Sequence, residues 1–178
     1  MKRSLPLILV VLMLCACGAK PETQEEKISR IDQEETYPDV PGTLAVVYPS
    51  LEELAKDAQL IVVGKPGAVE ERGMFVRTAF EVEQVLKGEA EEEQITVLEG
   101  KGNEKTVMGG IPWLSEEHTY CLMLQQAEEG YVVCGAFQGR FILREGYYFQ
   151  QAIQGVKLAE YSPAVEMDFE GMIRDSLS

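Results

Sequence analysis

The residues best able to do chemistry in this chain are four cysteines and a single histidine. Cys15 and Cys17 stand one residue apart in the stretch LMLCACGAK, at the end of an apolar run, whereas Cys121 and Cys134 lie in the second half of the chain. Closely spaced cysteines can bind a metal, form a disulfide or belong to a processing signal. The residues around each pair of cysteines therefore have to indicate which of these roles that pair has.

The sequence offers no catalytic or metal-binding constellation. His118 precedes Cys121 by three residues on one predicted strand, so their side chains point to opposite faces and cannot act as a base and a nucleophile. No set of close Cys, His and acidic residues has the spacing of a zinc site. The acidic run at 91–93 lacks the spacing and the glycine of a calcium-binding loop. We therefore expect a protein that is not an enzyme, with no metal and no cofactor.

The first residues have the organisation of a secretory signal. Lys2 and Arg3 form a basic start, and residues 5–14 form an apolar run interrupted only by Pro6. A transmembrane helix needs about 20 apolar residues, so this run is too short to span a bilayer. The segment is typical of a signal peptide that is removed from the mature protein.

The end of this segment, Leu14-Cys15-Ala16-Cys17, resembles the lipobox of bacterial lipoproteins. The resemblance implies cleavage after Ala16, so that residues 1–16 are the signal and Cys17 becomes a lipidated N-terminus. Cys15 fits the same role poorly, because the bulky Leu14 would then precede the cleavage point. A lipid on Cys17 would anchor the protein to the cell membrane on its extracytoplasmic face.

Residues 17–41 are predicted to form a disordered acidic tether after the lipidated cysteine, because the segment is polar and poor in apolar residues. Residues 42–178 are predicted to form one β-rich domain. The chain has a formal net charge of −14, and such a charge repels nucleic acid backbones. The expected partners are therefore the membrane, through the lipid, and an envelope protein or a small ligand, but no nucleic acid.

The domain is predicted to be mainly β with two short helices, folded as a small antiparallel barrel. A helix is expected over 50–58, with Ser50 and Glu53 as a capping box. A second helix is expected over 162–178, with Ser162 as its N-cap. Alternating or continuous apolar patterns predict strands between them, and these lie at 59–65, 74–88, 94–100, 118–126, 131–137, 139–144 and 147–150.

Cys121 and Cys134 are expected on the two arms of one β-hairpin. A hairpin centred between Ala127 and Glu128 would place them directly opposite each other, since 121 + 134 = 127 + 128. Opposed residues have Cβ atoms about 4.5–5.5 Å apart, which is close to disulfide reach. The alternative is two buried thiols that pack as small apolar side chains.

The order of strands in residues 57–64, 80–88, 95–97 and 120–124 resembles the OB-fold module of metalloproteinase inhibitors and netrin C-terminal domains. The resemblance implies an OB-like barrel. Those inhibitors use an N-terminal Cys-x-Cys against the protease zinc, and Cys15-Ala16-Cys17 imitates that motif. Because Cys15 would leave with the signal, we do not expect protease inhibition.

One further set of side chains is a candidate binding surface: Trp113, Gln138, Arg140 and Phe141. OB-like barrels bind ligands across a strand face, and Arg140 could meet a carboxylate inside the protein or on a ligand. The alternative role for this set is packing in the core or at its rim. We expect a lipoprotein that binds a protein or small ligand at the cell envelope, or else a structural accessory of an envelope complex without a ligand pocket.

Overall fold

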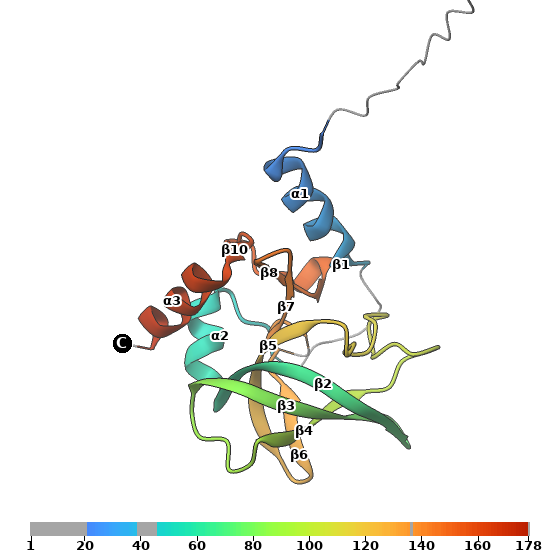
Figure 1. Cartoon of the computed structure of the whole chain (residues 1–178). Helices are drawn as coiled ribbons and strands as arrows, with labels where there is room; N and C mark the ends of the chain where they lie inside the picture. The colour runs from blue at the N-terminus through green and yellow to red at the C-terminus, as the bar shows by residue number, and fades with distance from the viewer. Residues whose placement is uncertain (1–20, 39–45, 136, 178) are drawn as a thin grey trace, which may run out of the picture.

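The computed structural model describes residues 21–38, 46–135 and 137–177. The signal peptide, Cys15, Cys17 and the expected boundary at 41–42 lie outside the described residues. The described part is mainly β, with three α-helices and an eight-stranded mixed sheet (Figure 1). The predicted β-rich class is therefore confirmed. No helix in these ranges combines the length and apolar character needed to cross a membrane.

The elements follow one another in the order in which Figure 1 labels them. They are α1 (Gln24–Glu34), β1 (Thr36–Tyr37), α2 (Leu51–Asp57), β2 (Leu60–Arg72), β3 (Phe75–Lys87), β4 (Gln94–Gly100), β5 (Thr119–Ala127), β6 (Gly130–Val133), β7 (Arg140–Arg144), β8 (Tyr147–Gln150), β9 (Ala152–Ile153), the 3-10 turn η1 (Gln154–Val156), β10 (Ala164–Val165) and α3 (Glu166–Ser176).

The large sheet has the order β10-β8-β7-β5-β2-β3-β4-β6, and β5 also pairs with β6. Its neighbours are antiparallel except β4 and β6, which run parallel. The pairings from β5 through β2, β3, β4 and β6 therefore return to β5. Strands β7, β8 and β10 extend the sheet beyond this circuit, and β1 pairs separately with β9.

The two larger of the three clusters of buried apolar side chains form layers on either side of β2 and β5, and the third is formed by Val107, Ile111, Phe137 and Ile153. One layer lies under α2 and α3, and its aromatic centre is formed by Phe141, Tyr148 and Phe169, with Phe169 within 5.0 Å of both other rings, centroid to centroid. The other layer lines the inside of the strand circuit and includes Phe80 and Leu122. Because alternate residues of β2 and β5 face these two layers, residues 60–63 and 120–124 are continuously apolar.

The helix α1 was not expected, so the prediction of a disordered tether is wrong over 24–37. Thr23 and Glu26 form a capping box that starts the helix. Ile31 is 1% exposed and packs into the layer inside the strand circuit. A single buried isoleucine in an acidic segment is a weak sequence signal, which explains why composition alone indicates a tether.

The two predicted helices are present, but one begins later than expected. Ser50 caps α2 by accepting a hydrogen bond from the Glu53 backbone, as predicted. The predicted N-cap Ser162 is wrong, because α3 begins at Glu166. The residues just before that helix form β10 and pair with β8, so sheet pairing takes the place of the first predicted turn of helix.

Gly64 marks an irregularity in the pairing of β2 with β3, where the register shifts after Val63. A Cβ at Gly64 would lie 1.9 Å from the backbone oxygen of Glu81, whereas a Cβ at Gly67 would meet nothing closer than 3.6 Å. Only glycine therefore lets the two backbones approach at position 64.

We predict that Gly64→Ala lowers the free energy of unfolding by about 1–3 kcal/mol, because the backbone of β3 must move. The matched control Gly67→Ala, in the same strand, should change it by less than about 0.5 kcal/mol. Urea unfolding followed by circular dichroism measures both values. Equal effects of the two substitutions would contradict the close approach at Gly64.

Candidate functional site

Arg140 meets its carboxylate inside the protein. The side chain is 0% exposed, and its Nη1 donates to Glu99 Oε1 at 2.9 Å. The same guanidinium donates to the carbonyl oxygen of Pro112 and lies over the ring of Tyr120, 5.6 Å from its centroid. Arg140 is therefore a structural residue that joins β7 to β4, and it does not face solvent or a ligand.

This ion pair continues into a buried polar network that holds α1. Arg140 Nε donates to Gln151 Oε1 at 2.8 Å, and the Gln151 amide donates to Glu35, the residue that ends α1. Arg144 donates to the other oxygen of Glu35 at 2.7 Å. Glu35 is only 5% exposed, and these donors supply the hydrogen bonds that a buried carboxyl group needs.

Gln138 is also turned inward, and its amide joins two segments that lie far apart in the sequence. Its Oε1 accepts from the Tyr48 N–H at 2.7 Å. Its Nε2 donates to the carbonyl oxygens of Tyr48 and Val156, both at 2.8 Å. The backbone oxygen of Gln138 accepts from the Gln150 amide. The side chain thus satisfies irregular backbone that no strand could satisfy.

Phe141 and Trp113 complete the predicted set, and neither combines with the other members into an open site. Phe141 is 0% exposed and packs against Tyr161 and Phe169. Trp113 is half-buried and donates from its indole nitrogen to the Thr106 carbonyl, which fixes the loop after β4. Core and rim packing, the alternative stated for this set, describes all four side chains.

Cys121 and Cys134 are free, buried thiols. The predicted hairpin register is wrong, because Ala127 pairs with Gly130, so that the hairpin is centred one residue later than predicted. Within the sheet, Cys121 lies opposite Phe141 of β7, and the Cys134 N–H bonds to the Met123 carbonyl. Burial raises the pKa of the Cys134 thiol to about 12 and raises that of Cys121 further, so both thiols stay protonated at neutral pH.

The remaining titratable residues do not converge on a reactive centre in the described ranges. His118 lies just before β5 and makes an edge contact with the Tyr120 ring. No group of three or more His, Cys, Asp or Glu side chains there is placed to hold a metal ion. A cavity that the sequence did not indicate lies elsewhere in the described residues.

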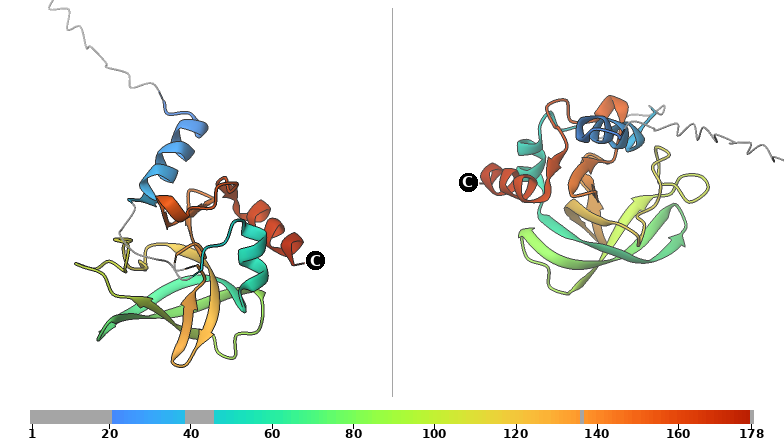
Figure 2. Two further views of the ribbon diagram at one scale, coloured as in Figure 1. Left: turned by 180° about the vertical axis from the view of Figure 1, so that it is seen from behind. Right: turned by 45° about the horizontal axis from the view of Figure 1, so that its top comes forward.

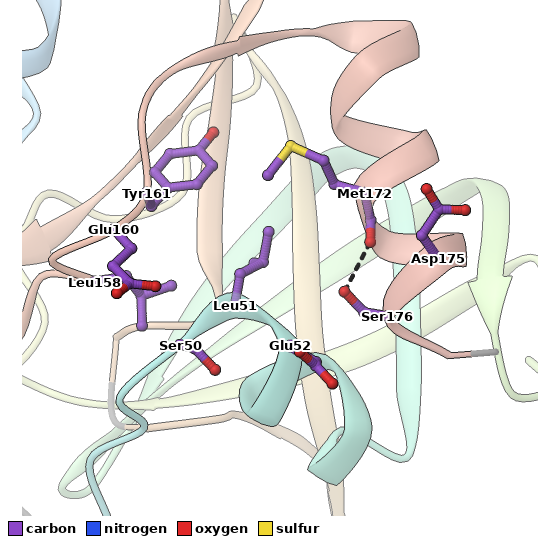
Figure 3. A pocket seen from close by; sticks show the side chains of 9 residues that line it. All are labelled: Ser50, Leu51, Glu52, Leu158, Glu160, Tyr161, Met172, Asp175 and Ser176. Carbon is purple, nitrogen blue, oxygen red and sulfur yellow. Dashed lines mark hydrogen bonds between the residues drawn. The ribbon is translucent and has the colours of Figure 1, made fainter.

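This cavity lies between the start of α2 and the end of α3 and has a volume of about 360 Å³. We call it the α2–α3 pocket. Its apolar lining consists of Leu51, Leu158, Tyr161 and Met172, and its polar lining consists of Ser50, Glu52, Glu160, Asp175 and Ser176. Leu51 and the methyl end of Met172 point into the space between the helices, and the Tyr161 ring closes the opposite side (Figure 3).

Each wall of the pocket is fixed by a contact with the core. Tyr48, which Gln138 holds, leads into Ser50 and α2. The Leu158 N–H donates to Gln150 Oε1 at 2.9 Å. The Tyr161 hydroxyl donates to the Tyr148 carbonyl, and burial raises the pKa of this phenol, so it remains neutral.

The helix α3 presents Met172 to the pocket as a consequence of its own amphipathic packing. Phe169 and Ile173 are fully buried against the sheet, so Met172 lies at the border of the buried face. It remains 40% exposed, and its flexible thioether suits a surface that adapts to a ligand.

The end of the β2–β3 hairpin lies far from α3 (Figures 1 and 2), and exposed apolar residues occur in the turn of this hairpin and beside it. Met74 and Met108 are 79% and 61% exposed, and Phe75 is 51% exposed. Phe75 pairs with Gly100, and a Cβ on Gly100 would lie 2.6 Å from the Met108 sulfur. The side chain of Met108 therefore covers Gly100 beside Phe75. We call these three residues the hairpin-tip patch.

Comparison with protein-family models and with curated proteins finds no match for this chain. Sequence reasoning missed the pocket residues Leu51, Leu158, Tyr161 and Met172. Their apolar character is ordinary for a core, and only the packing of α3 against α2 leaves them around a cavity. The sequence signal for the site is indirect. Gln138 is one of the predicted binding residues, and its amide positions two of the pocket walls.

We predict that Arg140→Met lowers the free energy of unfolding by about 3–5 kcal/mol, because Glu99 would remain buried without its partner. One oxygen of Glu99 already has no hydrogen-bond partner among the described residues. The double variant Arg140→Met with Glu99→Leu should therefore lose less stability than Arg140→Met alone. Urea unfolding measures the two variants, and a double variant less stable than the single one would contradict this account.

Proposed function

We propose that this chain is a membrane-anchored extracytoplasmic lipoprotein, without enzymatic activity, that binds a protein or a small ligand in the α2–α3 pocket. The observation that carries the binding role is the pocket itself, since an open cavity with an apolar lining and a few polar groups is the usual form of a ligand site. The anchoring role is supported by Leu14-Cys15-Ala16-Cys17.

We further propose that the domain is an OB-like barrel with added strands. The circuit of pairings from β5 through β2, β3, β4 and β6 back to β5 supports closure. The parallel pairing of β4 with β6 supports a five-stranded Greek-key path. In this architecture β7, β8, β10 and the helices form an addition at one side, and the α2–α3 pocket lies within that addition.

The docked helix α1 shortens the proposed tether. If Cys17 carries the lipid, only 24 − 17 = 7 residue steps separate it from the start of α1 at Gln24. Seven residues span at most about 25 Å. The domain would therefore be held close to the membrane surface, with the N-terminal end of α1 toward the lipid.

The second candidate function is assembly into an envelope complex, and the hairpin-tip patch is the observation that favours it. Exposed methionine and phenylalanine side chains that lie near one another are typical of protein contact sites. An assembly role predicts that replacing Met74, Phe75 and Met108 by serine removes the contact, whereas changes in the α2–α3 pocket do not affect it.

The lipid anchor is tested by metabolic labelling with a fatty-acid probe. Cys17→Ser should abolish labelling, because the thiol that receives the lipid is gone. The matched control Cys15→Ser should still be labelled, since that residue would leave with the signal. Labelling of Cys17→Ser equal to that of the original chain would contradict the proposal.

The pocket is tested by nuclear magnetic resonance of the methionine methyl groups in the full chain. We expect at least one class among cationic, anionic and neutral apolar fragments to shift the Met172 resonance. Met167 is the matched control, because it lies on the same helix, is 83% exposed and does not line the pocket. Equal shifts at both methyl groups, or no shift at Met172 with any class, would contradict binding in the pocket.

A further inference from the structure

We propose that the α2–α3 pocket receives a lysine side chain presented by a basic segment of a partner protein. This inference rests on the proposed function, because it names the chemistry of the ligand that the pocket takes. The argument comes from the shape of the apolar lining, the position of the acidic groups and the charge of the whole chain.

The apolar lining suits an unbranched aliphatic stem. Leu51 and Met172 face each other across the space between the helices, and Tyr161 forms the adjacent wall (Figure 3). A volume of about 360 Å³ is at the low end of the range for drug-sized ligands. A lysine stem of four methylene groups buries apolar surface along such a wall while its charged end stays in water.

The acidic groups are solvent-exposed members of the lining, and the charged end of that stem would emerge into solvent near them. Glu52, Glu160 and Asp175 all line the pocket. Lys56 is paired with Glu52, whereas Glu160 has no ion pair with any described residue. The pocket also borders the C-terminal end of α3, where the helix dipole adds partial negative charge that favours a cation.

The position of these acids favours a side chain over a free small molecule. A small cation placed against the buried lining residues would need charge compensation there, and those residues, Leu158 and Tyr161, carry no charge. A lysine on the surface of a partner instead places its ammonium at the rim, beside Glu160. The formal net charge of −14 would also speed the approach of a basic segment.

Lysine fits this site better than arginine for a geometric reason. A guanidinium is planar and binds best where a carboxylate can accept two parallel hydrogen bonds. The carboxylates here come from separate segments around an open rim. A compact ammonium at the end of a flexible stem does not need that planar geometry and can pair with Glu160 alone.

The test uses fluorescence anisotropy with the full chain and a labelled amphipathic helical peptide that carries lysines on its polar face. Two control peptides, in which another residue replaces lysine, separate the contribution of the aliphatic stem to binding from that of the positive charge. Acetyl-lysine keeps the stem and removes the charge, and diaminopropionic acid keeps the charge and shortens the stem. Each control should bind more weakly than the lysine peptide by about fivefold or more.

Variants of the protein locate the charge effect. Glu160→Gln should weaken binding of the lysine peptide by about two- to fivefold, the range of an exposed ion pair. Glu160→Lys should weaken it by about tenfold or more, because attraction becomes repulsion. Glu92→Lys, in the loop between β3 and β4, makes the same change in net charge and should alter the affinity by less than about twofold.

The outcomes separate this inference from the proposed function. Weaker binding of both peptide controls, with loss on Glu160→Lys but not on Glu92→Lys, supports lysine recognition. If Glu160→Lys and Glu92→Lys weaken binding of the lysine peptide equally, general attraction between opposite charges explains the binding, and the inference is overturned. If the lysine peptide leaves the Met172 methyl resonance unchanged while another fragment class shifts it, lysine recognition is wrong and the binding pocket stands. If no class shifts it, both proposals fail.

Discussion

The hydrogen bonds of the buried Gln138 side chain are the constraint on which the candidate site depends. One amide holds the backbone of Tyr48, before α2, and the carbonyl of Val156, before the segment that carries Leu158. A buried backbone group left without a partner costs about 1–3 kcal/mol. Gln138 therefore fixes two walls of the α2–α3 pocket without touching the cavity itself, and it is a positioning residue.

A second buried interaction sets the rest of the architecture. The pair of Arg140 and Glu99 joins β7 to β4 across the strand circuit, and Gln151 extends it to Glu35 at the end of α1. Buried charge is costly unless every donor and acceptor is satisfied. The network therefore specifies one arrangement of α1 against the sheet more than it adds stability. Docking of α1 follows from it, and so does the short proposed link to Cys17.

The strands could be predicted because their signal is local. The side chains of residues 75–87 alternate between more buried and more exposed positions. The sequence alternates apolar and polar residues over the same stretch, and this alternation predicts the strand that the structure shows as β3. The partners of Arg140 and Gln138 could not be predicted in the same way, because Glu99 and Tyr48 are 41 and 90 residues away. The sequence indicated that Arg140 could meet a carboxylate, either inside the protein or on a ligand, but it could not identify Glu99 as that partner.

The predicted register of the β5–β6 hairpin was wrong for a related reason. Its register depends on β4, which pairs with β6, and a Cβ at Gly130 would lie 2.5 Å from the Thr96 backbone oxygen of β4. This contact with a third strand is absent from any local pattern, and in the observed register Val133 lies opposite Leu124, so Cys134 does not lie opposite Cys121. The pocket could not be predicted for the same reason, because the helices α2 and α3 that form its walls are separated in the sequence by most of the domain.

The most direct test of the account is to measure intermolecular nuclear Overhauser effects between the lysine methylene protons of the bound peptide and the methyl groups of the protein. The α2–α3 pocket predicts contacts to Leu51 and Met172. Contacts to Met74 and Met108 instead would place the partner on the hairpin-tip patch, at the opposite end of the molecule (Figures 1 and 2), and would contradict the account.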